Sequence, residues 1–129
     1  MQNPARLFQA LADETRLKAL ALIHRHGELC VCDVMNVLGI TQSKASRHLR
    51  YLLNAGLLKD RRETIWAYYR MPDDLSSEQH RIIDTLPDLL GKETWTGLER
   101  AFTTWMQQKS CKGPCADLSD LPVSTGVNP

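Results

Sequence analysis

Long hydrophobic runs are absent from this sequence of 129 residues. No stretch approaches the roughly 18 consecutive apolar residues that a membrane-spanning helix needs, so we expect no membrane partner. The N-terminus also has no apolar core ahead of its first charges, which argues against a secretory signal and for a cytoplasmic protein. The sequence also lacks the polar bias and high net charge that are typical of disordered chains. Its net charge is +1 and 43% of its residues are hydrophobic, so we expect no extended disorder.

Cysteine is scarce, and the four cysteines fall into two close pairs. Cys30 and Cys32 form a Cys-x-Cys pair, and Cys111 and Cys115 lie near the C-terminus. In a reducing cytosol we expect thiols or metal ligands here rather than disulfides. A Cys-x-x-Cys motif beside a βαβ pattern is absent, which argues against a small thiol oxidoreductase and against an enzyme in general.

Neither sign of charge is in excess overall, yet the charges are unevenly distributed. Residues 41–70 hold seven basic side chains and two acidic ones, whereas residues 71–129 are acidic. A basic block is what a nucleic-acid-binding face requires, and it fits a solvated surface equally well. The seven basic residues are Lys44, Arg47, Arg50, Lys59, Arg61, Arg62 and Arg70.

The first part of the sequence has the caps and apolar spacing of helices. Pro4 suits the first turn of a helix over residues 4–12, and Asp13 caps a second helix that Gly27 ends. The spacing predicts that the second helix buries one stripe of side chains, made of Leu17, Leu20, Ala21 and His24.

Two further helices flank Gly39 and predict a helix-turn-helix. The first covers residues 31–38, and Thr41 caps the second, which runs to about residue 55. A short helix, a tight turn and a helix with one polar face are the parts of a DNA-reading motif, although any helical bundle can contain them. The polar face comprises Gln42, Ser43, Ser46, Arg47 and Arg50.

A basic β-hairpin follows and favours DNA binding. Residues 57–61 and 65–70 are β-prone and flank a turn at residues 62–64. A hairpin in this position is the wing of a winged helix-turn-helix, a mostly α fold with a small β-hairpin wing.

Helical spacing returns after the hairpin. Ser76 or Ser77 is expected to cap a helix that Pro87 and Gly91 divide, and large apolar residues recur at helical spacing over residues 93–108. In so small a domain, this amphipathic stretch predicts an α-helical dimer interface.

The chain therefore divides into two parts. Residues 1–109 are expected to form the DNA-binding and dimerisation domain. Residues 110–129 are rich in proline, glycine and serine and predict a flexible tail that contains the second cysteine pair.

Cys30 and Cys32 stand where the third helix is expected to begin. The positive end of a helix lowers thiol pKa values, so we expect thiolates there, and thiolates suit thiophilic ions. Residues i and i+2 of a helix point about 200° apart, so both sulfurs grip one ion only if this turn is unwound. An ion would then act as a switch beside the DNA reader. A small buried hydrophobic role for the cysteines is the alternative.

Four separate stretches match one known family. They are ALADETRL at residues 10–17, ELCVCDV at 28–34, QSKASRHL at 42–49, and residues 55–70. Together they resemble the ArsR family of winged-helix, metal- and metalloid-responsive repressors, and within it the arsenite/antimonite sensors. The resemblance extends over about residues 5–72. It implies a homodimer that represses transcription on double-stranded operator DNA and is released by trivalent arsenic or antimony, with no catalytic cofactor.

The inducer site departs from the family pattern at one position. The arsenite sensors carry a third cysteine where this sequence has Met35, whose neutral thioether is a poor substitute for a thiolate. Cys111, Cys115, a small thiol or a water molecule then become candidates for the third ligand. The tail pair could equally bind its own ion, be incidental, or act as a redox pair.

Two alternatives within the same class remain. Cadmium/lead sensors of the family share the ELCVCD stretch but draw further cysteines from an N-terminal arm, which is cysteine-free here before Cys30. Zinc sensors use paired ligands on their last helices, and His80 and Asp84 form one pair only, so we interpret them as a solvated face. A soft-metal sensor or a thiol-redox-switched repressor would use the same fold.

The expected DNA interface lies on the fourth helix and the wing. Gln42, Ser43, Ser46 and Arg47 are expected at base edges, and Lys44 and Arg50 at phosphates. His48 is expected to support the helix or touch a phosphate. Arg61 and Arg62 are expected to touch the backbone or the minor groove.

Overall fold

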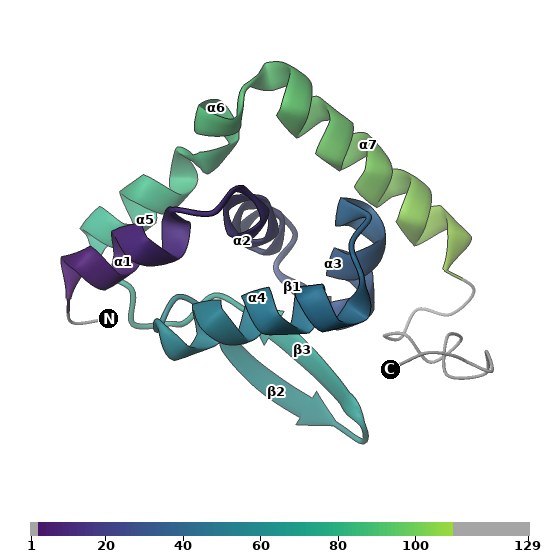
Figure 1. Cartoon of the computed structure of the whole chain (residues 1–129), viewed down its shortest axis with the longest axis horizontal. Helices are drawn as coiled ribbons and strands as arrows, with labels where there is room; N and C mark the ends of the chain where they lie inside the picture. The colour runs from purple at the N-terminus through teal and green to yellow at the C-terminus, as the bar shows by residue number, and fades with distance from the viewer. Residues whose placement is uncertain (1–2, 110–129) are drawn as a thin grey trace.

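The computed structural model describes residues 3–109, and over them the winged helix-turn-helix prediction is confirmed. Figure 1 shows α2 at the centre, with α3, α4 and the wing on one side and α1, α5, α6 and α7 arching around the other. The elements in chain order are α1 (Pro4–Leu11), α2 (Glu14–His26), β1 (Glu28–Cys30), α3 (Val31–Leu38), α4 (Gln42–Asn54), β2 (Lys59–Glu63), β3 (Trp66–Arg70), α5 (Ser77–Asp84), α6 (Leu86–Leu90) and α7 (Lys92–Gln108).

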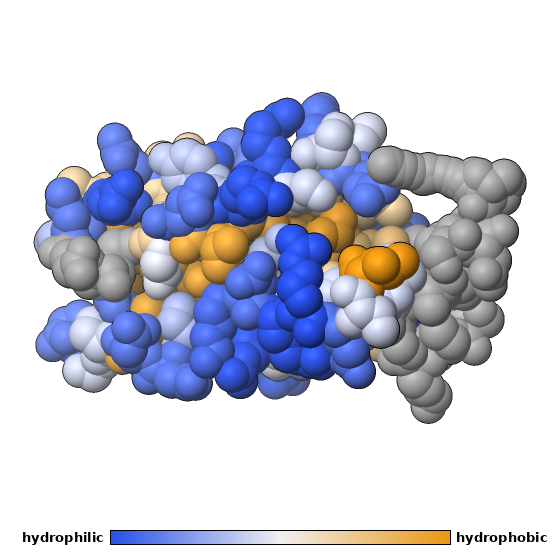
Figure 2. Space-filling model, turned by 90° about the horizontal axis from the view of Figure 1, so that it is seen from below, coloured by the Kyte–Doolittle hydropathy of each residue, from blue (hydrophilic) through white to orange (hydrophobic). Residues whose placement is uncertain are grey.

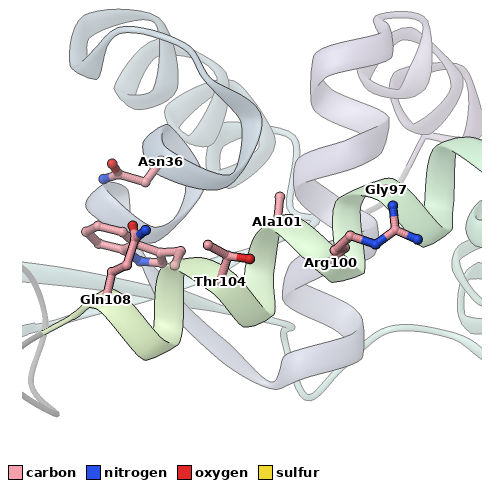
Figure 3. Close-up of a pocket in the computed structure, with 7 residues that line it drawn as sticks. Asn36, Gly97, Arg100, Ala101, Thr104 and Gln108 are labelled. Atoms are coloured by element: carbon pink, nitrogen blue, oxygen red, sulfur yellow. The ribbon is translucent and has the colours of Figure 1, made fainter.

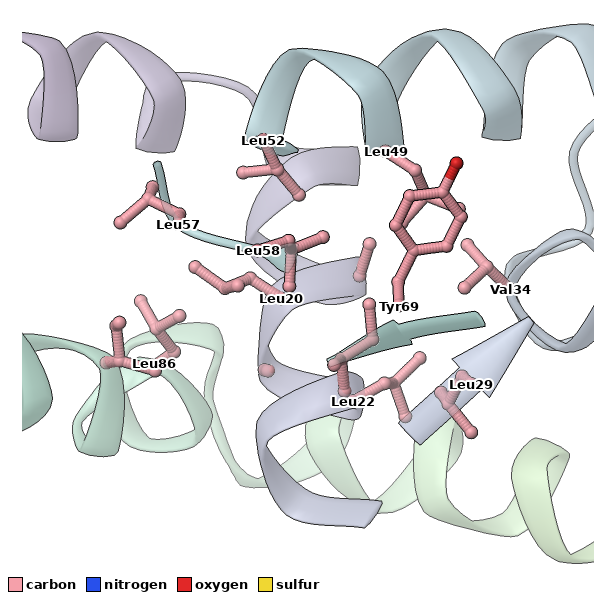
Figure 4. Packing of buried hydrophobic residues seen from close by; sticks show 14 of the residues in the cluster. Leu20, Leu22, Leu29, Val34, Leu49, Leu52, Leu57, Leu58, Tyr69 and Leu86 are labelled. Atoms are coloured by element: carbon pink, nitrogen blue, oxygen red, sulfur yellow. The ribbon is translucent and has the colours of Figure 1, made fainter. Parts of the chain in front are cut away.

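Helix α2 is the centre of the hydrophobic core. Five consecutive residues, 19–23, are buried, so this helix is covered on every side. The prediction of a single inner stripe is wrong, because His24 and Leu17 are partly exposed while Leu22 and Ile23 are fully buried. Figure 4 shows side chains from α3, α4, the wing strand and α6 converging on this helix.

The corner between α1 and α2 is fixed by side-chain caps. Asp13 accepts a hydrogen bond from the Arg16 N–H at 3.1 Å and caps α2, as predicted. The Arg16 side chain turns back and donates to the carbonyl oxygen of Ala10 at 2.7 Å. Its guanidinium also lies 4.0 Å from the centre of the Tyr51 ring on α4. The stretch at residues 10–17 thus joins α1, α2 and α4.

The turn between α3 and α4 follows the predicted pattern. Gly39 ends α3 in the left-handed conformation, with φ of 68°, which glycine adopts without steric cost. Thr41 then caps α4 by accepting a hydrogen bond from the Lys44 N–H at 3.2 Å. These two residues set the angle at which α4 leaves α3.

The wing belongs to a three-stranded antiparallel sheet of order β1-β3-β2. The sequence did not predict β1, which pairs with β3 through Leu29 and Tyr69. The hairpin also closes later than predicted, because residues 63 and 66 pair and leave Thr64 and Ile65 as the turn. Leu57 and Leu58, expected in the first strand, are buried core residues that precede it.

The last three helices are divided where the sequence predicted. Ser76 caps α5, Pro87 lies in the first turn of α6, and Gly91 separates α6 from α7. Apolar side chains remain exposed on α1, α6 and α7, namely Phe8, Leu89 and Met106. Within residues 3–109 no helix is both long and apolar enough to cross a bilayer.

Candidate functional site

Helix α4 separates its core side from its polar side as the sequence predicted. Ala45, Leu49 and Leu52 are buried against the core. Hydrophilic side chains dominate the surface that carries α4 and the wing (Figure 2). The exposed residues are Gln42, Ser43, Lys44, Arg47 and Arg50, and Ser46 and His48 are partly exposed.

Arg61 and Arg62 differ in what they contact. The Arg61 guanidinium donates two hydrogen bonds of 2.9 Å to the Glu28 carboxylate on β1 and a third of 3.0 Å to Glu63. It also lies 4.3 Å from the centre of the Tyr68 ring. Within the described part of the chain, Arg62 forms no ion pair, so of the two it is the more available cation.

His48 lies at the boundary between the core and the polar face of α4. Partial burial lowers its pKa, and the neighbouring Asp13 carboxylate only partly opposes this effect. A neutral imidazole is therefore favoured near pH 7, which suits packing better than neutralising a phosphate.

Cys30 is the last residue of β1 and the N-terminal cap of α3. Its side chain is 1% exposed. The prediction of a lowered thiol pKa is wrong for this residue, because burial and the adjacent Asp33 carboxylate raise the pKa of Cys30 to about 12. Since burial outweighs the helix dipole, Cys30 is held as a neutral thiol.

Cys32 lies in the first turn of α3 and is partly exposed. It is disulfide-bonded, so the expectation of a thiol or metal ligand rather than a disulfide is wrong for this residue in the structure. Its carbonyl oxygen accepts a hydrogen bond from the Asn36 side chain at 2.8 Å. The structure therefore gives the two cysteines different settings, one buried at the end of a strand and one at the helix surface. Cys111 and Cys115 lie outside the described residues.

Sequence reasoning missed Asp33, a charged residue that is buried as a whole, backbone included. Its Oδ2 accepts a hydrogen bond from the Cys30 N–H at 3.0 Å. Its Oδ1 accepts from Trp105 Nε1 at 2.8 Å and from Lys109 Nζ at 2.9 Å. Burial alone would raise the pKa of Asp33, but the bonds from Lys109 and Trp105 outweigh it and hold the pKa below its usual value.

A solvent-open groove follows α7 beside α3. In Figure 3 it is lined by Asn36 on α3 and by α7 residues that include Ala101, Thr104 and Gln108. Trp105 also lines it.

The histidines of α2 contact the later helices. Asp84 is exposed, as predicted, and its Oδ1 lies 2.6 Å from His24 Nε2. His26 bonds to Glu99 at 2.6 Å and stacks on Phe102. No group of three or more histidine, cysteine or acidic side chains with metal-binding geometry occurs among residues 3–109.

The arrangement defines a class of protein. A capped, polar-faced helix after a tight turn, with a basic hairpin beside it, is a winged helix-turn-helix DNA-binding unit. The model of the family described as bacterial regulatory protein, arsR family, matches residues 13–60. Together with a relative that is 46% identical over 72% of its own length, this match shows that the chain belongs to the ArsR family of transcriptional repressors, as its sequence resemblance indicated.

Relatives at the sequence level regulate arsenic resistance. Over 83 residues the chain is 46% identical to the arsenic resistance transcriptional regulator ArsR2 of Pseudomonas putida, which covers 64% of this chain and 72% of that protein. Over 81 residues it is 46% identical to the arsenical resistance operon repressor of Escherichia coli, which covers 63% of this chain and 69% of the relative.

Solved structures share the fold. A homodimeric winged helix-turn-helix DNA-binding domain from Mycobacterium bovis aligns with a TM-score of 0.55 and 31% identity, over 69% of this chain and 78% of that one. The AntR antimony-specific transcriptional repressor aligns with a TM-score of 0.56 and 28% identity, over 67% of this chain and 76% of that one.

Proposed function

We propose that the protein is a homodimeric repressor that occupies a promoter operator and leaves it when trivalent arsenic or antimony binds Cys30 and Cys32. The observation that carries this proposal is the position of the pair. Cys30 ends a strand that is hydrogen-bonded to the wing, and Cys32 lies in the first turn of α3, the helix that positions α4. An ion bound there acts on both DNA-contacting elements.

Binding of the ion requires the start of α3 to change. Cys30 is buried, protonated and extended at the cap position, whereas Cys32 belongs to the helix. A thiol or phosphine reductant must first convert the disulfide at Cys32 to a thiol. Each thiol proton then leaves as water with a hydroxide of the arsenite or antimonite, and the ion reaches Cys30 only if the first turn opens. The names of the arsenic- and antimony-responsive relatives support this choice of ion.

The third sulfur is proposed to come from Cys111 or Cys115. Three thiolates neutralise a trivalent ion, and Met35 supplies only a neutral thioether. Lys109, two residues before Cys111, lies against Asp33 in the first turn of α3. Two extended residues span at most about 7 Å, so only a short segment is needed for a tail cysteine to reach the start of α3 from Lys109.

The DNA interface is proposed on α4 and the wing, within a residue 1–109 domain. Gln42, Ser43, Ser46 and Arg47 meet base edges, Lys44 and Arg50 meet phosphates, and His48 supports the helix. Arg62 meets the backbone, and Arg61 does so only if its pairing to Glu28 loosens. A dimer of such units requires an inverted repeat with half-sites roughly one or two helical turns apart.

One titration tests the proposal. The protein is reduced with a phosphine, which is then removed without air. Operator binding is followed by fluorescence anisotropy in thiol-free buffer while arsenite, antimonite, cadmium, lead, zinc or a peroxide is added. We expect release by arsenite and antimonite, retained operator binding by C30S/C32S, and loss of release in that variant. Release by cadmium or lead alone would identify a soft-metal sensor, and release by peroxide without an ion would identify a redox switch. C30S/C32S that still releases DNA at the wild-type arsenite concentration would place the site elsewhere.

A further inference from the structure

The Asp33 carboxylate joins the start of α3 to the end of α7. Oδ2 accepts from the backbone N–H of Cys30, and Oδ1 accepts from the side chains of Trp105 and Lys109. These partners lie 72 and 76 residues further along the chain. We refer to Asp33, Trp105 and Lys109 as the clasp.

The charged groups of the clasp are buried, so separating the Asp33 carboxylate from the Lys109 ammonium even partly costs free energy. The side chains of Asp33 and Lys109 are 6% and 5% exposed. A buried ion pair is tolerated when its hydrogen bonds are complete, and each charge becomes costly when the other moves away. The clasp therefore favours two states, one closed as observed and one in which water reaches the separated groups.

Inducer capture conflicts with the closed state. Cys30 and Cys32 flank one residue at the helix start, so bringing both sulfurs to one ion changes the backbone at Cys30 or unwinds the first turn. Asp33 is the third residue of that turn and is bonded to the Cys30 N–H. Movement of either residue displaces the carboxylate from Trp105 and Lys109.

We propose that Asp33 is a positioning residue that couples the inducer cysteines to α7, and that ion binding at Cys30 and Cys32 opens the clasp once a reductant has converted the disulfide at Cys32 to a thiol. This inference rests on the proposed function and adds the route by which the ion acts. The groove beside α3 leaves room for the freed end of α7 to shift (Figure 3). Because α7 packs on both α3 and α6, the shift changes how α7 meets the DNA-reading half of the molecule.

Coupling of this kind is reciprocal. If the closed clasp favours operator binding and opposes ion binding, opening it by mutation weakens the first and strengthens the second by related factors. Asp33→Asn keeps the shape of the side chain and an acceptor for the Cys30 N–H, and removes the charge that holds Lys109. A residue with only a structural role would not tighten arsenite binding when it is replaced.

The experiment measures operator affinity with and without arsenite, and arsenite affinity by equilibrium dialysis, on the full chain after reduction of its disulfide with a phosphine. We expect D33N and K109M to bind the operator about 10-fold more weakly, to bind arsenite more tightly, and to show a correspondingly smaller effect of arsenite on DNA binding. K109R keeps the charge and is expected to keep most of the coupling. K92M, at the exposed start of α7, is the matched control and is expected to behave as wild type.

Trp105 provides a second readout that needs no disruption of the clasp. Arsenite is expected to shift the tryptophan emission of the wild-type protein, because the indole loses its carboxylate partner. The shift is expected to disappear in W105F and in C30S/C32S. It serves as the deciding measurement should D33N fail to fold by circular dichroism.

The outcomes separate this inference from the proposed function. A wild-type protein that does not bind arsenite, or is not released by it, overturns the proposed function and the clasp with it. Normal arsenite release with wild-type coupling in D33N and K109M overturns the clasp alone. A tryptophan emission shift that persists in W105F also contradicts the clasp. So does a K109R variant in which arsenite affects DNA binding as little as it does in K109M.

Discussion

Arg61 on β2 and Glu28 on β1 are joined by two hydrogen bonds of 2.9 Å, although β3 lies between their strands. The guanidinium crosses the Tyr68 ring to reach the carboxylate. Glu28 is two residues from Cys30, so the pair ties the wing to the segment that carries the proposed inducer site. Arg61 is thus a brace within the sheet, whereas Arg62 is the cation that remains available to DNA.

The two wing arginines are expected to respond differently to removal. Arg62→Ala should weaken binding to all DNA sequences alike and reduce the slope of log affinity against log salt by about one. Arg61→Ala should change that slope less, because its charge is already compensated by Glu28 and Glu63. Salt titrations of anisotropy on operator and random duplexes test this. A loss confined to the operator in R62A would contradict its role as a phosphate contact.

Arg47 and Arg50 lie on the exposed face of α4 and form a matched pair for testing base readout. Arg47→Ala should cost roughly 1–3 kcal/mol on the operator and little on random DNA, because a base contact is lost. Arg50→Ala should weaken both duplexes equally. Competition binding with single-base-pair operator variants checks the assignment, and equal loss on all duplexes for R47A would place Arg47 on the backbone.

We expect Asp13, the N-terminal cap of α2, to make the free energy of unfolding depend on pH in the acid range. Burial opposes ionisation, but the bond from the Arg16 N–H and the charges of His48 and Arg16 outweigh it and lower the pKa of Asp13. A lowered folded-state pKa favours folding while Asp13 is ionised, so this stability is present above about pH 4 and is lost as pH falls through the folded-state pKa.

Asp13→Asn separates this titration from capping, since asparagine is also a good cap. Urea unfolding should show D13N less stable than wild type at neutral pH, because it lacks the ionised carboxylate, and the difference should shrink as the pH falls below about 4. Asp13→Ala should lose about 1 kcal/mol at neutral pH, because the cap itself is removed. Identical acid dependence in wild type and D13N would show that Asp13 does not contribute.

If Cys111 or Cys115 supplies the third ligand, removing both should change the number of sulfur atoms bound to arsenic. X-ray absorption of arsenite-loaded protein without added thiols should show three sulfur neighbours in wild type and one fewer in C111S/C115S. An unchanged three-sulfur shell would exclude recruitment of the tail. Loss of one of two bound arsenic atoms, with the other unchanged, would reveal a separate tail site.

Features that depend on short-range sequence were predictable. Asp13, Gly39, Thr41 and Ser76 act through residues within about one helical turn, so their roles as caps and breaks follow from spacing alone. The polar face of α4 follows from helical periodicity for the same reason. The family resemblance was carried by these local stretches, which is why the fold was predicted correctly.

Features that depend on distant partners were not predictable. Strand β1 is three residues long and forms only because β3 offers it an edge. The neutral Cys30 thiol results from burial, which overrides the helix dipole on which the sequence argument relied. Asp33 is anchored by Trp105 and Lys109, and no local pattern links residues so far apart in the chain.

The turn of the wing has a practical consequence for anyone who labels this protein. Thr64 has φ of 57°, in a region that costs a β-branched residue on the order of 1–2 kcal/mol, and Ile65 beside it is 74% exposed. Glycine at position 64 would relieve that cost. One dye attached at position 65 through a side chain other than cysteine would leave the strand pairing and the start of α3 unchanged. The tip is therefore the natural place to mount an optical reporter of docking and release.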